Sequence, residues 1–473
     1  MLYVNFSEYM KEKIKNNKDK QISNNKPNLE LVKGTRDYLP AEQLVREGIM
    51  DVLKTNFKKY GYSPIETTIL EHWEIATSKY AGGEEILKET YKLTDQGGRD
   101  LALRYELTFK FGKLIGMNPE MRMPVKRYEI GKVFRDGPVK TGRLREFTQC
   151  DVDVIGTSNL VSDSEFMSMI FSVFKDLNID VYVQINNRKI LFGLFEEVGI
   201  PKDKHMDTAL ALDKLEKFGE QVVRNELSEK DISSLSINKL FELLNEATPL
   251  ATNKNKLDLF DSKLTNQLAK QGITELKEIF TNCNYLGVSG VIQFVPTLSR
   301  GLAYYTGPMW EVYQKDAPES KITSSLAAGG RWDGMVQKFL DSKEEYPAVG
   351  MTFGLDPIYL VLEEKGIKKS ATTNINVPSV LLVSINTMPQ TLALATKLRD
   401  EGISTDISLY KRVKNAFEFA NKQDIPIVAV LGETEVTNNT INIKNMVSGK
   451  EEAIKTEHMV ERIKTLLRST TQP

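Results

Sequence analysis

Two stretches in which polar and apolar residues alternate, 127–134 and 145–156, lie on either side of a short break. Alternation with a period of two is typical of β-strands, and Asp136-Gly137-Pro138 in the break indicates a loop. The second stretch places polar residues on one face and mostly apolar residues on the other, and the polar residues are Gln149, Asp151 and Asp153. Such a strand forms either the floor of a binding site or a sheet rim with one solvated face.

Other patterns predict the elements on either side of these strands. A helix over 41–60 is expected to begin after Pro40, a residue that fits the first helical turn, and to be followed by a strand at 65–70. The segment 91–104 is typical of a hairpin with a glycine turn. Residues 186–283 contain apolar residues at helical spacings and few strand signals, so a helical module is expected to interrupt the first domain.

The two ends of the chain differ from the rest. Residues 1–28 are rich in Lys and Asn and are predicted to form a disordered tail. The last hundred residues alternate between strand and helix patterns, which predicts a small α/β domain over 378–473. The elements expected there are strands at 380–383, 403–407 and 425–431, helices at 389–401 and 413–423, and a hairpin at 440–445.

Composition narrows the class of protein. The chain has 473 residues, enough for two or three cores, and its 27% charged and 41% hydrophobic residues are typical of a soluble globular protein. A net charge of −1 gives no basic field that predicts a DNA partner, so RNA contacts must come from local patches. No apolar run is long enough for a membrane span, and the N-terminus lacks a signal core. The two cysteines predict a cytoplasmic protein without a disulfide framework. The three histidines lack metal-ligand spacing, so no metal site built by the protein alone is expected.

Three arginines, Arg135, Arg143 and Arg145, surround the loop between the two alternating strands. A guanidinium group is permanently charged and presents a planar fork of donors that fits phosphate oxygens. The carboxylates on the neighbouring strand suit an ammonium group. The residues alone therefore indicate a ligand that carries a phosphate together with an amino acid, and the solvated rim strand stays open as the alternative.

These residues resemble a known family. Arg135, followed by a loop and Arg145-Glu146-Phe147, resembles motif 2 of the class II aminoacyl-tRNA synthetases. Gln149-Cys150-Asp151-Val152-Asp153 narrows the resemblance to the histidyl-tRNA synthetases. Arg300-Gly301-Leu302-Ala303-Tyr304-Tyr305-Thr306-Gly307 is similar to a signature of that family and its close relatives. Further stretches resemble the family and follow one another in the family's order. These stretches are 33–37, the helix 41–60 with Pro64, 104–108, 327–334, 347–358 and 411–422.

The resemblance implies roles for individual residues. Arg135 and Arg300 are expected to stabilise charge on the α-phosphate of ATP. The other implied contacts are Glu106, Thr108, Gln149, Asp153, Tyr304 and Tyr305 for histidine, Arg135, Arg143, Arg145, Gly329, Gly330 and Arg331 for ATP, and Lys411, Arg412 and Lys414 for tRNA. Without the resemblance, two adjacent tyrosines are most often part of core packing, and two adjacent glycines are typical of a turn.

The resemblance also implies a fold and a reaction. It predicts an α+β catalytic domain with an antiparallel sheet at 29–185 and 284–373, a helical insertion at 186–283, and a C-terminal α/β anticodon-binding domain at 378–473. The implied function is that of a histidine–tRNA ligase, which uses ATP and Mg²⁺, with the metal expected on the pyrophosphate side. The implied partners are L-histidine, tRNA(His) and a second copy of the chain in a two-fold dimer, without membrane or DNA.

Two positions depart from the family pattern. Ala303 stands where an aspartate is usual, and Pro357 stands where the arginine of motif 3 is expected. They leave open a different class of function, a non-catalytic paralogue that senses histidine and regulates another enzyme. The presence of a C-terminal domain, and the retention of Arg135, Arg145 and Arg300, favour the ligase.

Overall fold

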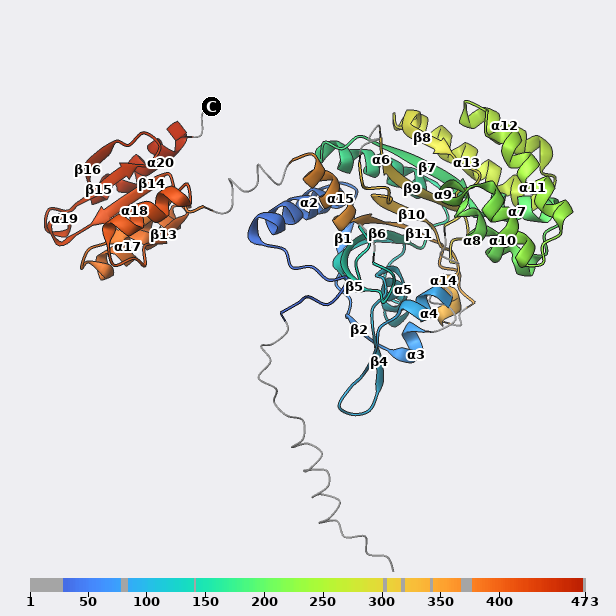
Figure 1. The fold of residues 1–473 in the computed structure, drawn as a ribbon, viewed down its shortest axis with the longest axis horizontal. Helices are drawn as coiled ribbons and strands as arrows, with labels where there is room; N and C mark the ends of the chain where they lie inside the picture. The colour runs from blue at the N-terminus through green and yellow to red at the C-terminus, as the bar shows by residue number, and fades with distance from the viewer. Residues whose placement is uncertain are drawn as a thin grey trace, which may run out of the picture.

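Most of the chain is described by the computed structural model, in the ranges 29–77, 84–139, 142–300, 304–315, 320–340, 343–366 and 377–470 (Figure 1). The tail predicted at 1–28 and the Ala303 position lie outside the described residues.

A mixed sheet of eight strands forms the centre of the first part of the chain. Its strand order is β1-β5-β6-β11-β10-β9-β7-β8, and neighbouring strands are antiparallel except β1–β5 and β7–β8 at the two edges. The predicted α+β class with an antiparallel-rich sheet is confirmed. The strands are β1 (Ser63–Pro64), β5 (Val125–Phe134), β6 (Glu146–Ile155), β7 (Val181–Asn187), β8 (Ile292–Phe294), β9 (Pro308–Gln314), β10 (Ala327–Arg331) and β11 (Ala348–Gly354).

Helices cover the apolar face of this sheet. Cys150, Val152 and Val154, the apolar side of β6, are buried in the same core as one stripe of α2. That stripe repeats every four residues, as expected of a helix with one buried face, because 3.6 residues make a turn. The covering helices are α2 (Pro40–Lys59), α6 (Val161–Asp176) and α15 (Leu355–Glu364), and Figure 1 shows them together above the sheet. Cys150 and Cys283 are both buried free thiols.

Smaller elements lie near the other, polar face. A three-stranded sheet of order β2-β4-β3 contains the predicted hairpin as β3 (Lys92–Thr94) and β4 (Asp100–Leu103), with β2 (Leu70–His72) at its edge. The strand predicted at 65–70 is wrong. The chain leaves β5 after Ile65, because the Glu129 carboxylate accepts the Thr67 N–H at 2.9 Å. The helices of this region are α3 (Trp73–Ala76), α4 (Glu84–Glu89), α5 (Thr108–Met117) and α14 (Met335–Leu340).

Helices fill the range in which a helical module was expected. The first two residues of the predicted range, Asn186 and Asn187, belong to β7, and α7 and α13 pack against one another and contact β7. Buried residues of these helices belong to the same core as the sheet, so the module's boundaries stay a prediction. The helices are α7 (Arg188–Glu197), α8 (His205–Leu212), α9 (Leu215–Phe218), α10 (Glu220–Glu229), α11 (Ser234–Ala247), α12 (Asn253–Lys263) and α13 (Gln267–Tyr285), with short 3₁₀ turns at Lys202–Lys204 and Ser289–Val291.

The C-terminal residues form the predicted α/β domain. Its five-stranded sheet has the order β13-β12-β14-β15-β16 and is parallel over the first three strands. Residues 440–445 form a single strand that pairs with β16, and not a complete hairpin. Among the described residues, no helix combines the length and apolar character needed to cross a membrane. The elements are β12 (Val380–Ser384), α17 (Met388–Asp400), β13 (Thr405–Ile407), α18 (Val413–Lys422), β14 (Ile427–Leu431), α19 (Glu433–Thr437), β15 (Thr440–Asn445), β16 (Glu451–Lys455), a 3₁₀ turn (Thr456–His458) and α20 (Met459–Thr470).

Candidate active site

The register of the large sheet brings polar residues from four strands onto one face, with small residues of β10 among them. Residues alternate between faces along a strand, and residues paired across strands share a face. Asp153 of β6 is paired with Arg127 of β5 and with Gly350 of β11, and Gly350 is paired with Gly330 of β10. We call this polar face the site face. Its next row, two residues along each strand, consists of Glu129, Asp151, Thr352, Ala328 and Glu311.

Three buried oxygen atoms on the site face have no hydrogen-bond partner among the described residues. They are Gln149 Oε1, Asp151 Oδ1 and Asp153 Oδ2, from successive site-facing positions of β6. A buried acceptor without a donor costs about 1–3 kcal/mol, so such atoms mark places where a ligand supplies donors. The alternative of a solvated rim strand is wrong, because none of the three residues is more than 8% exposed.

Asp153 lies against a fully buried arginine. Arg127 Nη2 is 2.7 Å from Asp153 Oδ2, although the two are not aligned as a hydrogen bond. Gly350 leaves space for this carboxylate, since a Cβ at that position would overlap Asp153 Oδ1. Burial raises the pKa of Asp153. Arg127 lowers it, but the like charges of Asp151 and Glu106 add to the effect of burial, so the pKa lies above its usual range.

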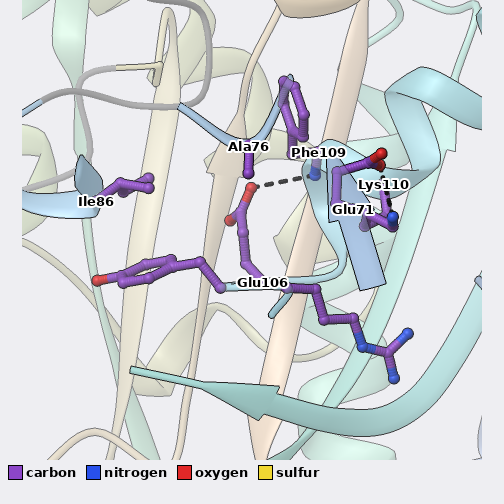
Figure 2. Close-up of a pocket in the computed structure, with 8 residues that line it drawn as sticks. Glu71, Ala76, Ile86, Glu106, Phe109 and Lys110 are labelled. Carbon is purple, nitrogen blue, oxygen red and sulfur yellow. Dashed lines mark hydrogen bonds and ion pairs between the residues drawn. The ribbon is translucent and has the colours of Figure 1, made fainter. Parts of the chain in front are cut away.

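Glu106 lies two residues before α5 and is also buried. Its carboxylate accepts the Phe109 N–H at 3.1 Å and the Tyr304 hydroxyl at 3.2 Å. Figure 2 shows it directed between Ala76 and Phe109, in a cavity of about 20 Å³ that is large enough for one water molecule. Burial, followed by the charge of Asp151, raises the pKa of Glu106 to about 7. A bound cation would lower this pKa, because it supplies the missing opposite charge.

Asp151 lies next to the start of α5. The Thr108 hydroxyl donates to Asp151 Oδ2 at 3.4 Å, so the helix start and β6 are joined at this point. Gln149, the next site-facing residue, donates its amide N–H to the Thr352 hydroxyl at 3.5 Å. Burial raises the pKa of Asp151, and Arg127 and Thr352 only partly oppose this effect.

The two adjacent tyrosines connect these carboxylates to an arginine. Their ring centroids are 4.9 Å apart, and Tyr304 binds Glu106 as described. The Tyr305 ring lies 5.4 Å from the guanidinium carbon of Arg300. Tyr305 also approaches Gly330 so closely that a Cβ there would overlap its ring. A glycine at 330 therefore lets the tyrosine lie directly on the sheet.

Arg300 extends from a strained backbone. Its φ of 49° lies in the left-handed region that non-glycine residues rarely adopt. Nη1 donates to Glu311 at 2.7 Å, while Nε is buried without a hydrogen-bond partner among the described residues. Arg188 Nη2 donates to the Arg300 backbone carbonyl at 3.1 Å and stabilises this conformation. The guanidinium thus retains donor capacity that a ligand can use.

The arginines of the predicted phosphate loop are anchored at different points. Arg135 stacks on Tyr105, with its guanidinium carbon 4.2 Å from the ring centroid, and donates to the Tyr105 carbonyl at 3.3 Å. Arg143 donates to both carboxylate oxygens of Glu89, at 2.9 and 3.1 Å. Arg145 pairs with Asp136 at 3.1 Å. Arg135 is therefore held beside Glu106, while Arg143 and Arg145 order the loop.

Arg331 lies at the end of β10, next to the glycine pair. It is only 3% exposed and its guanidinium binds Asp163 of α6, the Thr157 carbonyl and Asp333. Period-two alternation directs it, like Gly329, to the helix-covered face, opposite Gly330. The ATP contact predicted for Arg331 requires it to leave these partners, so this contact stays a prediction that its surroundings do not support.

Comparison with known proteins identifies the family. The profile of the family described as "Histidyl-tRNA synthetase" matches residues 34–358. Histidine–tRNA ligase 1 of Bacillus cereus is 42% identical over 422 residues, which cover 89% of this chain and 94% of that protein. The chain belongs to the histidyl-tRNA synthetase family.

Solved structures agree with this assignment. The histidyl-tRNA synthetase of Nostoc superposes with a TM-score of 0.71 at 26% identity, over 93% of this chain and 100% of that chain. A protein of Bacillus halodurans, titled as an ATP phosphoribosyltransferase regulatory subunit/histidyl-tRNA synthetase, has a TM-score of 0.68 at 21% identity over 84% of this chain and 97% of that chain. This second likeness shows the fold alone. The C-terminal domain matches the anticodon-binding family over residues 379–466.

Several residues of this histidyl-tRNA synthetase site escaped the sequence analysis. Arg127, Glu129, Glu311 and Thr352 complete the site face. The period-two pattern within β5 and β9 was a usable signal for Arg127, Glu129 and Glu311. It did not show which strands lie beside β6. Pro357, in the first turn of α15, follows Asp356, which accepts Arg46 Nη1 at 2.5 Å. The Asp356 carboxylate, next to Pro357, is therefore used to hold two helices together.

Proposed function

We propose that the chain is a cytoplasmic histidine–tRNA ligase. One observation carries the choice of substrate, namely the three buried oxygens of β6 that accept no hydrogen bond from the described residues. The ammonium group and imidazole N–H of histidine supply donors of the kind that these oxygens lack. Glu106 and Thr108 are assigned to the ammonium group, and Gln149, Asp153, Tyr304 and Tyr305 to the ring side of histidine.

The arginines support activation by ATP. A carboxylate oxygen of histidine attacks the α-phosphorus, the bond to the β-phosphate oxygen breaks, and pyrophosphate leaves, giving histidyl-adenylate. A ribose hydroxyl at the end of tRNA(His) then attacks the carbonyl carbon, and AMP leaves. Arg135 and Arg300 are assigned to the α-phosphate, where their charge offsets the charge that develops in the transition state. Arg143, Arg145 and Gly330 are assigned to the rest of ATP, whereas Gly329 lies, like Arg331, on the helix-covered face.

Magnesium is proposed to enter as part of the substrate. In the described part of the chain, no group of three or more His, Cys, Asp or Glu side chains is placed to hold a metal ion. Mg²⁺ keeps several waters and binds readily to substrate phosphates. We therefore assign the ion to the pyrophosphate portion of MgATP, where it neutralises the leaving group.

The decisive test of this function is histidine-dependent exchange of labelled pyrophosphate into ATP by the full chain. A ligase catalyses exchange with histidine and none without it. A regulatory paralogue binds histidine but gives no exchange, so histidine binding without exchange contradicts the proposal. The anticodon-binding match over 379–466 favours the ligase, because a regulator has no use for an anticodon.

We also propose a two-fold dimer formed through α2 and β1. β1 is an edge strand of the large sheet, and the segment before α2 exposes apolar side chains, including Leu39 (69% exposed) and Val32 (68%). Exposed apolar surface of this kind is typical of an interface. Sedimentation at micromolar concentration is expected to give twice the chain mass of 53.6 kDa, and a monomer contradicts the proposal.

The tRNA contact is proposed at the start of α18. Lys411, Arg412 and Lys414 are all exposed, and the rings of Tyr410 and Phe419 lie 5.4 Å apart beside them. Cations with nearby aromatic rings suit single-stranded RNA. Changing the three cations to glutamine is expected to weaken tRNA binding and flatten its salt dependence, while histidine activation stays intact.

A matched control removes the same charge elsewhere on this domain. Lys397, Lys422 and Lys450 are also exposed, and their replacement by glutamine is expected to change tRNA affinity much less. Affinity is measured by filter binding at several salt concentrations. Equal losses of tRNA affinity in the two triple variants mean that the effect comes from net charge alone. A loss of histidine activation without a loss of tRNA affinity means that this domain has a different role.

A further inference from the structure

The backbone segment that leads to Arg300 is held by a side chain at the end of β7. Residues 295–300 follow β8 and lie outside any helix or strand. Asn186 is fully buried, and its amide group donates to the Pro296 carbonyl at 2.9 Å and to the Leu298 carbonyl at 2.8 Å. Buried carbonyls need donors. Asn186 therefore supplies to this segment the hydrogen bonds that a neighbouring strand supplies elsewhere in the sheet.

Two further contacts hold the last two residues of the segment. Arg188, only 2% exposed, donates from Nη2 to the Arg300 carbonyl at 3.1 Å. The buried Ser299 hydroxyl donates to the Ala209 carbonyl of α8 at 2.6 Å. A left-handed conformation such as that of Arg300 persists only where the surrounding structure fixes it. The contacts before and after Arg300 together provide this constraint.

The residue between Asn186 and Arg188 has different partners. Asn187 caps α7, because its side-chain oxygen accepts the Lys189 N–H at 2.9 Å, and its amide group donates to Glu275 of α13 at 2.7 Å. Successive side chains at the end of a strand point in opposite directions. Asn186 is thus directed to the segment before Arg300, whereas Asn187, of the same type and equally buried, is directed to the helices.

We infer that Asn186 and Arg188 are positioning residues for Arg300, which hold its backbone so that the guanidinium group meets the α-phosphate correctly in the transition state. This inference rests on the proposed function, because it names what orients a group assigned to ATP. Both side chains act through the backbone of the segment and touch no substrate. A misplacement of about 1 Å can lower a reaction rate about 10²-fold, so contacts that fix this backbone matter for catalysis.

The test compares Asn186→Ala and Arg188→Met with the matched control Asn187→Ala in the full chain. The first two variants are expected to lower the rate of adenylate formation about 10–100-fold, with little change in KM for histidine or ATP. Arg188→Lys keeps one donor for one carbonyl and is expected to retain most of the rate. Asn187→Ala is expected to lower the melting temperature, since α7 loses its cap, without a comparable loss of rate.

Two readouts separate positioning from a general loss of stability. In an Arg300→Lys background, Arg188→Met is expected to add little further loss of rate, because both changes act through one guanidinium group. Losses that multiply overturn the inference. Amide hydrogen exchange in residues 297–300 is expected to become faster in Asn186→Ala and Arg188→Met, but not in Asn187→Ala. Unchanged exchange beside a lowered rate, or a normal rate in both variants, also overturns it.

A third variant covers the case in which Asn186→Ala does not fold. Ser299→Ala removes one hydroxyl and leaves the Ala209 carbonyl bonded to the Asp213 N–H at 3.0 Å within α8. It is expected to show the same pattern with a smaller loss of rate, and a normal rate overturns the inference. Absence of histidine-dependent pyrophosphate exchange in the wild type refutes the proposed function instead. Amide exchange still tests in that case whether the end of β7 holds the segment.

Discussion

Replacing Arg300 with lysine is expected to lower the rate of histidyl-adenylate formation about 10²–10³-fold, the usual cost of removing one preorganised charged donor from a transition state. The structure gives the reason. One nitrogen of the guanidinium donates to Glu311 at 2.7 Å, while Nε has no hydrogen-bond partner among the described residues. A guanidinium can bind Glu311 and a phosphate at once, whereas a lysine has one ammonium group for both. KM for histidine and for ATP is expected to change little, because the contact strengthens only as charge develops.

The competing explanation is that Arg300 only stabilises its strained loop. A matched control is Arg46→Lys, because Arg46 is also a buried arginine paired with a carboxylate, Asp356, but on the helix-covered side of the sheet. Arg46→Lys is expected to lower the melting temperature without a comparable loss of turnover in the folded enzyme. Single-turnover adenylate formation and thermal melting of both variants separate the explanations. Normal turnover in Arg300→Lys, or a melting defect that accounts for all of its lost activity, removes Arg300 from the mechanism.

Replacing Asp153 with alanine is expected to raise the KM for histidine at least about 30-fold, and the KM for ATP far less. The site is built with an acceptor at this position, and a substrate N–H buried without it has no partner. A second effect follows from the structure. Arg127 is fully buried, and loss of the Asp153 carboxylate leaves Glu129, at 3.7 Å, as its one ion-pair partner among the described residues. Breaking a buried ion pair typically destabilises a protein by about 3–5 kcal/mol.

Because the two effects have different origins, they are measured separately. KM values come from pyrophosphate exchange at a temperature where the variant is folded, and stability comes from denaturant unfolding. Equal increases in KM for histidine and ATP place Asp153 outside the amino-acid pocket. A stability loss without a change in either KM makes the residue a partner of Arg127 alone.

The sequence predicted local features of the site because they depend on local geometry. In a strand, successive side chains must point to opposite faces, so the order of residues in β6 already separated Gln149, Asp151 and Asp153 from Cys150 and Val152. The loop between Arg135 and Arg145 was predicted in the same way. The resemblance to a family then assigned roles to Glu106, Thr108 and Tyr305, which no periodicity could provide.

The sequence did not predict which groups neutralise one another. A buried charge is balanced by whatever lies across the sheet or from another element, and these neighbours are far apart along the chain. Arg331 illustrates this, since its cationic side chain and adjacent glycines suggested ATP, but Asp163 of α6 binds it on the other face. Thr67 similarly ended the predicted strand at 65–70 through its contact with Glu129.

The sequence by itself determined which residues of each strand share a face, because the backbone fixes that alternation within a few residues. Only the tertiary structure decided that β11, β10 and β9 lie beside β6 in that order. Together with the pairing of β5 with β6, it places Arg127 against Asp153. Strand pairing depends on hydrogen bonds between distant segments and on the packing of helices over one face, and no local pattern encodes either.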